Sequence, residues 1–450
     1  MTEIKQNKMG VMPVGKLLLS MSLPAMFSML IQALYNIVDT IYISQISEEA
    51  VFTMTIVFPM QMILISLALG GAIGTSTLVA RRLGQGQHEE ANKTASTGLI
   101  LSIFHSVICA LVGIFLTKPF LALFTTDAQI IAMGFDYLSI VMGVAIGVYV
   151  GMFFERLSQA QGNMILPMCS LLIGAITNII LDPIFIFGWW IVPAMGIKGA
   201  AIATVIGQVL GMLFISAAML IGKHEVKLQF KGLHLRWSRI RDIYAIGLPV
   251  TVMNMVGAFA NMALNAVVVA YSQLAVSALG LYFKLSSFVF MPVFGLNQGA
   301  LPILSFNYGS QDKKRYSRVV QLFFWVAVVI MAIGTVFFWL QTDLLISMFE
   351  VSPALQEMTR TVLRTISLCF VVFGISIVLS TIFQSLGKAF TSMMMSLLRQ
   401  MILLVPLAYL LGQAFGVNGI WYTYLISEVV VVLSFTPYCY KVYKQAFAKE

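Results

Sequence analysis

Ser22-Leu23-Pro24, near the start of the sequence, returns as Gly247-Leu248-Pro249, 225 positions further along the chain. The same offset relates Gln159-Ala160-Gln161-Gly162 to Gln384-Ser385-Leu386-Gly387. One constant offset across such distant landmarks indicates an internal duplication, in which residues 22–162 recur as residues 247–387. In a membrane protein, two like halves usually enclose a path that can open to either side.

The composition places the chain in the membrane. Hydrophobic residues make up 59% of it and charged residues 10%, against roughly 45–50% and about 25% in soluble domains. Its apolar runs are long enough for helices that cross a hydrocarbon layer about 30 Å thick. Charges and Gly/Pro clusters divide these runs into about twelve spans: 17–43, 50–78, 94–117, 129–155, 163–187, 196–221, 243–270, 276–303, 316–340, 354–383, 390–414 and 418–440.

The even number of spans in each half fixes the kind of repeat. Both halves enter the membrane in the same direction, so they are parallel repeats about an axis along the membrane normal. We therefore predict an all-α integral membrane protein with about 12 transmembrane helices in two parallel six-helix bundles. The predicted domains are an N-terminal bundle (1–221), a cytoplasmic linker (222–242) and a C-terminal bundle (243–450).

Lysine and arginine set the predicted orientation. If the N-terminus is cytoplasmic, the outer segments hold only Lys118 and Lys198, and the inner segments hold the remaining loop cations. This bias accounts for the net charge of +9 without a nucleic-acid partner. The first apolar run is long and lacks a small-residue cleavage site, so we expect it to stay as the first span.

The sequence gives little support for a metal site or an enzyme. The four cysteines lie in different apolar runs without metal-ligand spacing, and the four histidines form no plausible metal cluster. No nucleophile–base pair or phosphate-binding loop is present, which argues against an enzyme. A channel remains open as an alternative, and saturable exchange coupled to a gradient would separate a carrier from a pore.

Polar groups inside the spans are the functional candidates, because an ionisable side chain there is costly. Asn178 and Asp182 are one helical turn apart and face one direction. Asp39 and Thr204 fall at similar depths from the same end of their spans, and Asn36 is one turn from Asp39. We expect these five residues to share a pocket in the outer half of the membrane. The alternative is that the two carboxylates meet water in the interfacial zone.

The chemistry of this cluster suits a proton or a hard monovalent cation such as Na⁺. Two carboxylates close together in a low dielectric resist being charged together, so reversible protonation is expected. Pro183 removes a backbone donor and is predicted to bend the helix beside Asp182. At the 225 offset Asp39 maps to Leu264, so the acidic site is specific to the first half.

The second half carries its own charges within the spans, Lys284, Arg399 and Glu428. Lys284 and Glu428 fall at comparable depths, so an ion pair between them is one expectation, either as a structural lock or as a substrate contact. The candidates for the substrate path are Gln32, Asn261, Asn265, Lys284, Arg399 and Glu428.

Several motifs carry a family resemblance over nearly the whole chain. Leu34-Tyr35-Asn36-Ile37-Val38-Asp39-Thr40, Ala80-Arg81-Arg82-Leu83-Gly84 and Asn178-Ile179-Ile180-Leu181-Asp182-Pro183 together resemble the multidrug and toxin extrusion (MATE) family. Phe290-Met291-Pro292-Val293-Phe294-Gly295 and Asn307-Tyr308-Gly309 are similar to its bacterial MepA-like branch.

The resemblance implies a V-shaped pair of bundles in the bacterial plasma (inner) membrane, with both termini cytoplasmic. It implies an antiporter that exports organic cations in exchange for H⁺ or Na⁺, working as a monomer among membrane lipids, with no cofactor besides the coupling ion. It places that ion, either H⁺ or Na⁺, at four residues that match the family pattern: Asp39, Asn178, Asp182 and Thr204.

Two departures and three rivals qualify the resemblance. The seventh span lacks the acidic residue of some members, and Lys284 and Arg399 make the second half locally basic.

The major facilitator superfamily also has twelve spans, but the loop at Ala80-Arg81-Arg82-Leu83-Gly84 lacks the expected Asp. The main alternative is a flippase or exporter of lipid-linked saccharides or metabolites, which would need a larger and more basic cavity. A membrane enzyme is the third rival.

Overall fold

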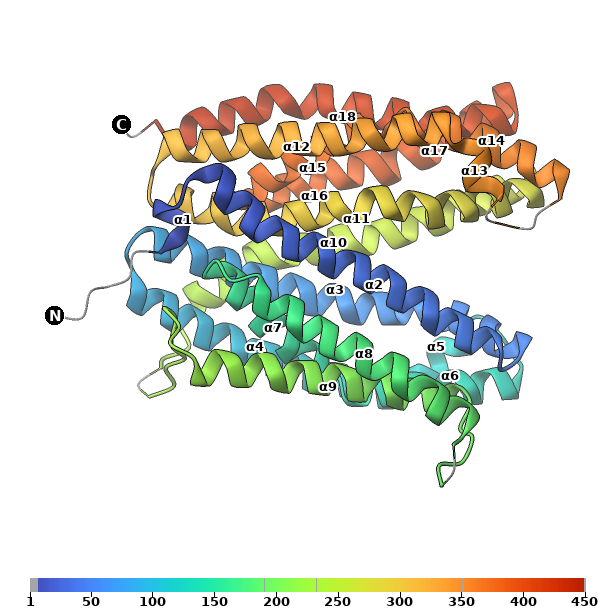
Figure 1. Ribbon diagram of the computed structural model, residues 1–450, viewed down its shortest axis with the longest axis horizontal. Coiled ribbons are helices and arrows are strands. Elements are labelled where there is room, and N and C mark those ends of the chain that lie inside the picture. The colour runs from blue at the N-terminus through green and yellow to red at the C-terminus, as the bar shows by residue number, and fades with distance from the viewer. Residues whose placement is uncertain (1–6, 190, 232, 348, 350–351, 449–450) are drawn as a thin grey trace. The chain divides into compact units, whose positions relative to one another are not determined.

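The computed structural model describes residues 7–189, 191–231, 233–347, 349 and 352–448 (Figure 1). Within these residues the regular structure is helical, apart from one isolated bridge between Trp189 and Val192. The helices are α1 (Lys8–Val11), α2 (Val14–Ser44), α3 (Glu48–Gly84), α4 (His88–Phe115), α5 (Thr117–Leu121), α6 (Ala128–Gly143), α7 (Ile146–Ala160), α8 (Ile165–Phe187), α9 (Ile197–Ile221), α10 (Trp237–Val269), α11 (Gln273–Gly309), α12 (Lys313–Leu340), α13 (Thr342–Ser347), α14 (Pro353–Ser367), α15 (Phe370–Ser385), α16 (Ala389–Leu397), the π-helix η1 (Leu398–Leu404), α17 (Val405–Phe415) and α18 (Val417–Ala446).

The predicted membrane architecture is confirmed, with two spans broken. Ten helical segments of the described chain are long and apolar enough to cross a membrane, and two bent pairs raise the number to twelve. The pairs α6/α7 and α14/α15 each bend by 45°. The sequence analysis treated 129–155 and 354–383 as continuous, since neither break contains the Pro that usually marks a kink.

The duplication is visible in the helix boundaries. Helices α3 and α11 begin and end 225 positions apart, and so do α4 and α12. The caps recur as well, because Ser47 accepts a hydrogen bond from the Ala50 amide and Ser272 accepts one from the Ala275 amide. Local capping chemistry was therefore copied along with the apolar pattern.

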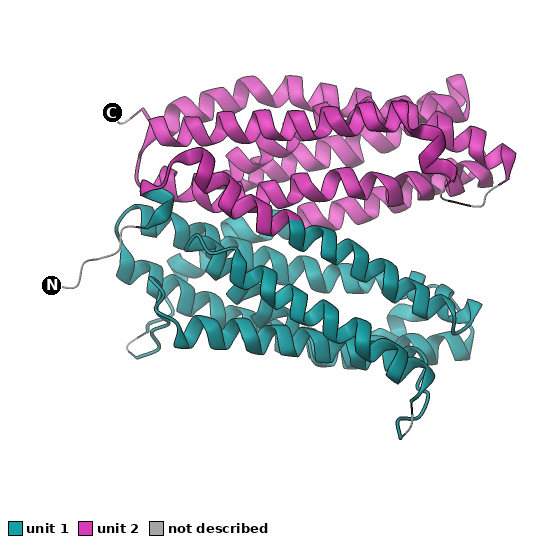
Figure 2. Cartoon of the chain, viewed as in Figure 1, with its two compact units in different colours: residues 1–10, 27–251 teal, residues 11–26, 252–450 magenta. Residues whose placement is uncertain are grey.

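The described chain packs into two compact units (Figure 2). Unit 1 comprises Met1–Gly10 and Phe27–Thr251, and unit 2 comprises Val11–Met26 and Val252–Glu450. The division falls inside α2 and α10, the first long helix of each repeat, so each of these helices contributes to both units. The boundaries predicted from the repeat, 1–221 and 243–450, mark duplicated sequence and stay a prediction.

The segment predicted as a linker, 222–242, is part of unit 1 and is hydrogen-bonded to its helices. Backbone amides of its extended part donate to buried side chains: Lys227 to Asn92 Oδ1 at 2.8 Å and Gln229 to Ser96 Oγ at 2.8 Å. Both acceptors lie on α4. A third amide, that of Val226, donates to Gln161 Oε1 at 2.9 Å. These bonds satisfy the backbone of the part of the segment that precedes α10 and lies outside the helices.

Glycines let α8 and α9 approach closely. A Cβ added to Gly199 would lie 2.3 Å from the carbonyl oxygen of Phe185, and one added to Gly207 would lie 2.6 Å from that of Gly174. Such backbone contacts are the usual means of helix association in a medium as apolar as the side chains themselves. The spacing of α8 and α9 therefore depends on these small residues.

Gly207→Ala tests this dependence. The new methyl must push α9 away from the Gly174 carbonyl, so we expect a loss of about 1–3 kcal/mol in unfolding free energy. Gly280→Ala in α11 is the matched control, because its Cβ would meet no atom within 4 Å. That control should differ from wild type by no more than about 1 kcal/mol. Thermal unfolding in detergent measures both, and equal stability of the two variants would contradict the packing argument.

Candidate functional site

The close packing of α8 and α9 creates a buried polar cluster in unit 1. The Asn178 amide nitrogen donates to Asp182 Oδ1 at 3.2 Å and to Thr204 Oγ1 at 3.2 Å. All three side chains are buried, with exposed fractions of 2%, 0% and 3% for Asn178, Asp182 and Thr204. Asn178 therefore bridges the two helices from a position one turn away from the acid.

Helix α2 adds the second carboxyl. Asp39 is half-buried, and its carboxyl group lies within hydrogen-bonding reach of Asp182 when one of the two carries a proton. Asp39 and Asp182 each stand five residues before the end of their helix, at Ser44 and Phe187. The structure thus brings together Asp39, Asn178, Asp182 and Thr204, four of the residues expected to share a pocket.

Three oxygens of this cluster lack a donor. Asp39 Oδ1, Asn178 Oδ1 and Asp182 Oδ2 are buried, and none accepts a hydrogen bond from the part of the chain that the structure describes. Buried acceptors are normally paired, because an unpaired one costs about 1–3 kcal/mol. A proton or a hard cation supplies the missing positive partner. Within the described residues, no group of three or more His, Cys, Asp or Glu side chains could hold a metal ion, so Na⁺ here would rely on amide and hydroxyl oxygens too.

Two tyrosines and a glutamine that the sequence analysis missed surround the acids. Tyr35 lies near Thr204, and the buried Tyr137 lies near Asp39. Gln61 Nε2 donates to the Tyr137 hydroxyl at 3.4 Å. Tyr35 is one turn before Asp39, and that spacing was the available signal. These rings keep the local dielectric low while their hydroxyls remain available as donors.

Other candidates lie elsewhere. Asn36 is exposed, and its backbone carbonyl accepts a hydrogen bond from Thr40 Oγ1 at 2.7 Å. The side chains of Gln32, Asn261, Asn265 and Lys284 are also exposed. The structure therefore does not bring Asn36 into the hydrogen-bonded cluster, and the substrate-path assignments remain predictions.

Arg399 and Glu428 form a separate buried pair in unit 2. Arg399 Nη1 lies 3.2 Å from Glu428 Oε1, and Ser376 Oγ donates to Glu428 Oε2 at 2.6 Å. The guanidinium group also stacks 4.9 Å from the centroid of the Phe373 ring. Glu428 is therefore paired with Arg399, whereas the sequence analysis had considered Lys284, whose side chain is exposed.

The local backbone at Arg399 departs from the ideal α-helix on which the sequence prediction relied. Arg399 lies on the π-helix η1, which ends two residues before Pro406. Proline offers no amide hydrogen, so the regular α-helical hydrogen bonding is already interrupted there. A π-helix also rotates the side chains that follow it relative to those of an ideal α-helix. Depth along an ideal helix, the basis of the sequence prediction, therefore could not identify the partner.

Substituting Arg399 tests whether its ion pair with Glu428 stabilises unit 2. Arg399→Leu leaves a buried carboxylate without its cation, so we expect a loss of about 3–5 kcal/mol in unfolding free energy. The double variant Arg399→Leu/Glu428→Leu should recover most of that loss, because no unpaired charge remains. Thermal unfolding of both variants in detergent is the measurement. A single variant as stable as wild type would show that the pair does not lock unit 2.

The MatE family model matches residues 24–184 and again residues 249–410. The two matches start 225 positions apart, which is the offset of the internal repeat, and together they cover well over half of the chain. The chain belongs to the MatE family. This membership identifies it as a multi-pass membrane transporter and removes the enzyme alternative.

Characterised relatives of this MatE protein differ in what they carry. It is 25% identical over 433 residues to the multidrug export protein MepA of Staphylococcus aureus (strain NCTC 8325 / PS 47), covering 94% of this chain and 92% of that one. It is 26% identical over 426 residues to a FAD transporter of Shewanella oneidensis, covering 93% of each chain. Similarity to these relatives extends over nearly the full length.

Solved structures show the same fold. An outward-facing multidrug resistance MATE family transporter of the MOP superfamily aligns with a TM-score of 0.92 and 22% identity, covering 99% of both chains. A MOP superfamily transporter from Pyrococcus furiosus, described as having a binding pocket of reverse polarity, also aligns with a TM-score of 0.92. At this identity the likeness supports the fold alone.

Proposed function

We propose that this MatE protein is a secondary active antiporter that exports lipophilic, cationic organic compounds in exchange for H⁺ or Na⁺. The observation that carries the proposal is the buried cluster in which Asp39 Oδ1, Asn178 Oδ1 and Asp182 Oδ2 have no donor among the described residues. The relatives named as multidrug export proteins support the substrate class.

Coupling follows from the cost of charge in this cluster. Two carboxylates in an apolar environment repel each other, and binding one H⁺ or Na⁺ removes that repulsion. The bound ion therefore favours the conformation in which the cluster is closed, and release of the ion favours the other one. If organic cations bind only when the carboxylates are free, exchange follows from competition for one state of the protein. Access to the site then alternates between the two faces of the membrane.

The remaining features of the proposal concern location and assembly. The concentration of Lys and Arg in alternate loops favours a bacterial plasma membrane location with both termini in the cytoplasm. In that orientation the acidic cluster lies toward the outer face. The coupling ion is the sole cofactor in this scheme, and a monomer among membrane lipids is sufficient for it.

A metabolite exporter is the second candidate function. The Shewanella oneidensis relative named as a FAD transporter supports it. In this chain, exposed Lys284 has no carboxylate within 4.0 Å in the described residues. A free cation of this kind suits an anionic substrate better than a cationic one. Flavin nucleotide therefore belongs in the transport assay beside the lipophilic cation.

Asp182→Asn and Asp39→Asn test the coupling site. Each variant removes a charge that the ion must neutralise, so efflux of a fluorescent lipophilic cation driven by a pH or Na⁺ gradient should fall to the rate of protein-free liposomes. Purified protein in proteoliposomes is compared under each gradient separately, which also names the ion. Asp136→Asn is the matched control, because this α6 carboxyl is exposed.

The efflux results distinguish the multidrug antiporter from the metabolite exporter. Loss of driven efflux in the two cluster variants, with normal efflux in Asp136→Asn, supports the proposal. Normal driven efflux in both cluster variants contradicts the site. If neither gradient drives the cation but one drives flavin nucleotide, the metabolite exporter replaces the multidrug exporter.

A further inference from the structure

The duplicated helices α4 and α12 differ in what covers their first turns. On α4, backbone amides of the 222–242 segment bond to Asn92 and Ser96. The equivalent positions on α12, 225 residues later, are Ser317 and Gln321. In the described residues no backbone amide is seen to bond to these two side chains; Ser317 Oγ is hydrogen-bonded to the Tyr443 hydroxyl of α18, and both side chains line an open hollow. The equivalent side chains are therefore bonded to an extended segment on α4 and border an open hollow on α12.

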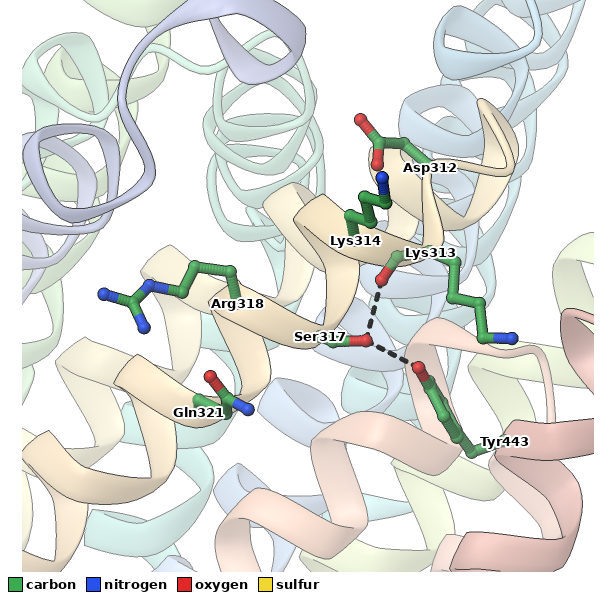
Figure 3. A pocket seen from close by; sticks show the side chains of 7 residues that line it. All are labelled: Asp312, Lys313, Lys314, Ser317, Arg318, Gln321 and Tyr443. Carbon is green, nitrogen blue, oxygen red and sulfur yellow. Dashed lines mark hydrogen bonds between the residues drawn. The ribbon is translucent and has the colours of Figure 1, made fainter.

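The hollow has a volume within the usual range of small-molecule sites. Its volume is about 780 Å³, and it lies between the start of α12 and the end of α18 (Figure 3). Six of the side chains that line it can donate hydrogen bonds: Lys313, Lys314, Ser317, Arg318, Gln321 and Tyr443.

Its charge is strongly positive and uncompensated. Lys313, Lys314 and Arg318 are exposed, and none lies within 4.0 Å of a carboxylate in the part of the chain that the structure describes. The one acid of the lining, Asp312, caps α12 by accepting the Arg315 amide at 2.9 Å. On α4, by contrast, the equivalent of Arg318 is Lys93, which pairs with Glu89 and Glu90. The positive charge of Lys93 on α4 is therefore paired, whereas that of Arg318 on α12 remains available to a ligand.

One wall of the hollow is fixed by aromatic packing. The Tyr443 ring stacks on Tyr316, with centroids 6.1 Å apart, and contacts Phe447 at 5.4 Å. Its hydroxyl group is hydrogen-bonded to Ser317 Oγ (Figure 3). Tyrosines with an apolar body and a polar tip are typical of the membrane–water boundary. Helices α12 and α18 are both long and apolar enough to cross a membrane, and the hollow lies at the start of one and the end of the other. We therefore place it at the membrane–water boundary.

We propose that this hollow binds the phosphate-bearing headgroup of an anionic phospholipid. Two lysines and an arginine provide the charge complement, and the hydroxyl groups of Ser317 and Tyr443 and the amide of Gln321 provide neutral donors for phosphate oxygens. Basic pockets between helices at the cytoplasmic surface are typical sites for such headgroups. A soluble phosphate compound offers the same chemistry, but the boundary position of the hollow favours lipid. The proposal does not depend on which substrate the protein exports.

The test measures lipid binding to the purified full-length chain. Native mass spectrometry in a neutral detergent gives the affinity for phosphatidylglycerol and, separately, for phosphatidylcholine. The triple variant Lys313→Gln/Lys314→Gln/Arg318→Gln should bind phosphatidylglycerol on the order of 100-fold more weakly at low salt, at roughly 5-fold for each charge removed. Its phosphatidylcholine binding should not change.

A matched triple removes the same charge elsewhere. Lys223→Gln/Lys227→Gln/Lys231→Gln alters exposed lysines of the segment that covers α4 and should keep wild-type affinity. Thermal unfolding establishes that both triples are folded. Equal phosphatidylglycerol binding by wild type and the first triple overturns the proposal, as does an equal loss in both triples. Displacement of the lipid by millimolar inorganic phosphate would assign the hollow to a soluble phosphate compound instead, which also overturns it.

Discussion

Pairing of buried polar groups is the constraint on which this structure depends. In hydrocarbon no water completes an unsatisfied donor or acceptor, so each polar atom inside the spans must find a partner within the protein. Helices satisfy the backbone, and close packing through Gly199 and Gly207 brings side-chain partners on neighbouring helices within reach. The hydrogen bonds from Asn178 to Asp182 and Thr204 follow from that packing.

The two buried charged sites use this constraint in opposite ways. Both carboxylate oxygens of Glu428 have a donor, one from Arg399 and one from Ser376, so its charge is fully paired within unit 2. In the described part of unit 1, Asp39 and Asp182 each retain a buried oxygen without a donor. A satisfied pair gives stability and local order, whereas an unsatisfied pair of acids creates a demand for a mobile positive ion. The second arrangement is the one that can couple transport to a gradient.

Duplication preserved the scaffold and allowed the surfaces to diverge. The boundaries of α3 and α4 recur in α11 and α12, and the capping serines recur with them. The acid at Asp39 has no counterpart, since Leu264 occupies the equivalent position. Side chains that hold a helix in place face the same requirement in both halves, but side chains that bind an ion or a headgroup do not.

The sequence by itself determined the class of protein, the twelve apolar spans, the repeat and most of the acidic cluster, because these depend on local periodicity and on depth along a helix. Only the tertiary structure decided the 45° breaks in α6/α7 and α14/α15, the tyrosines beside Asp39 and the partner of Glu428. These features depend on the rotation of each helix about its axis and on contacts between distant segments. The π-helix at Leu398–Leu404 is an example: Arg399 lies on it, and its hydrogen bonding departs from the ideal helical spacing on which the sequence prediction relied.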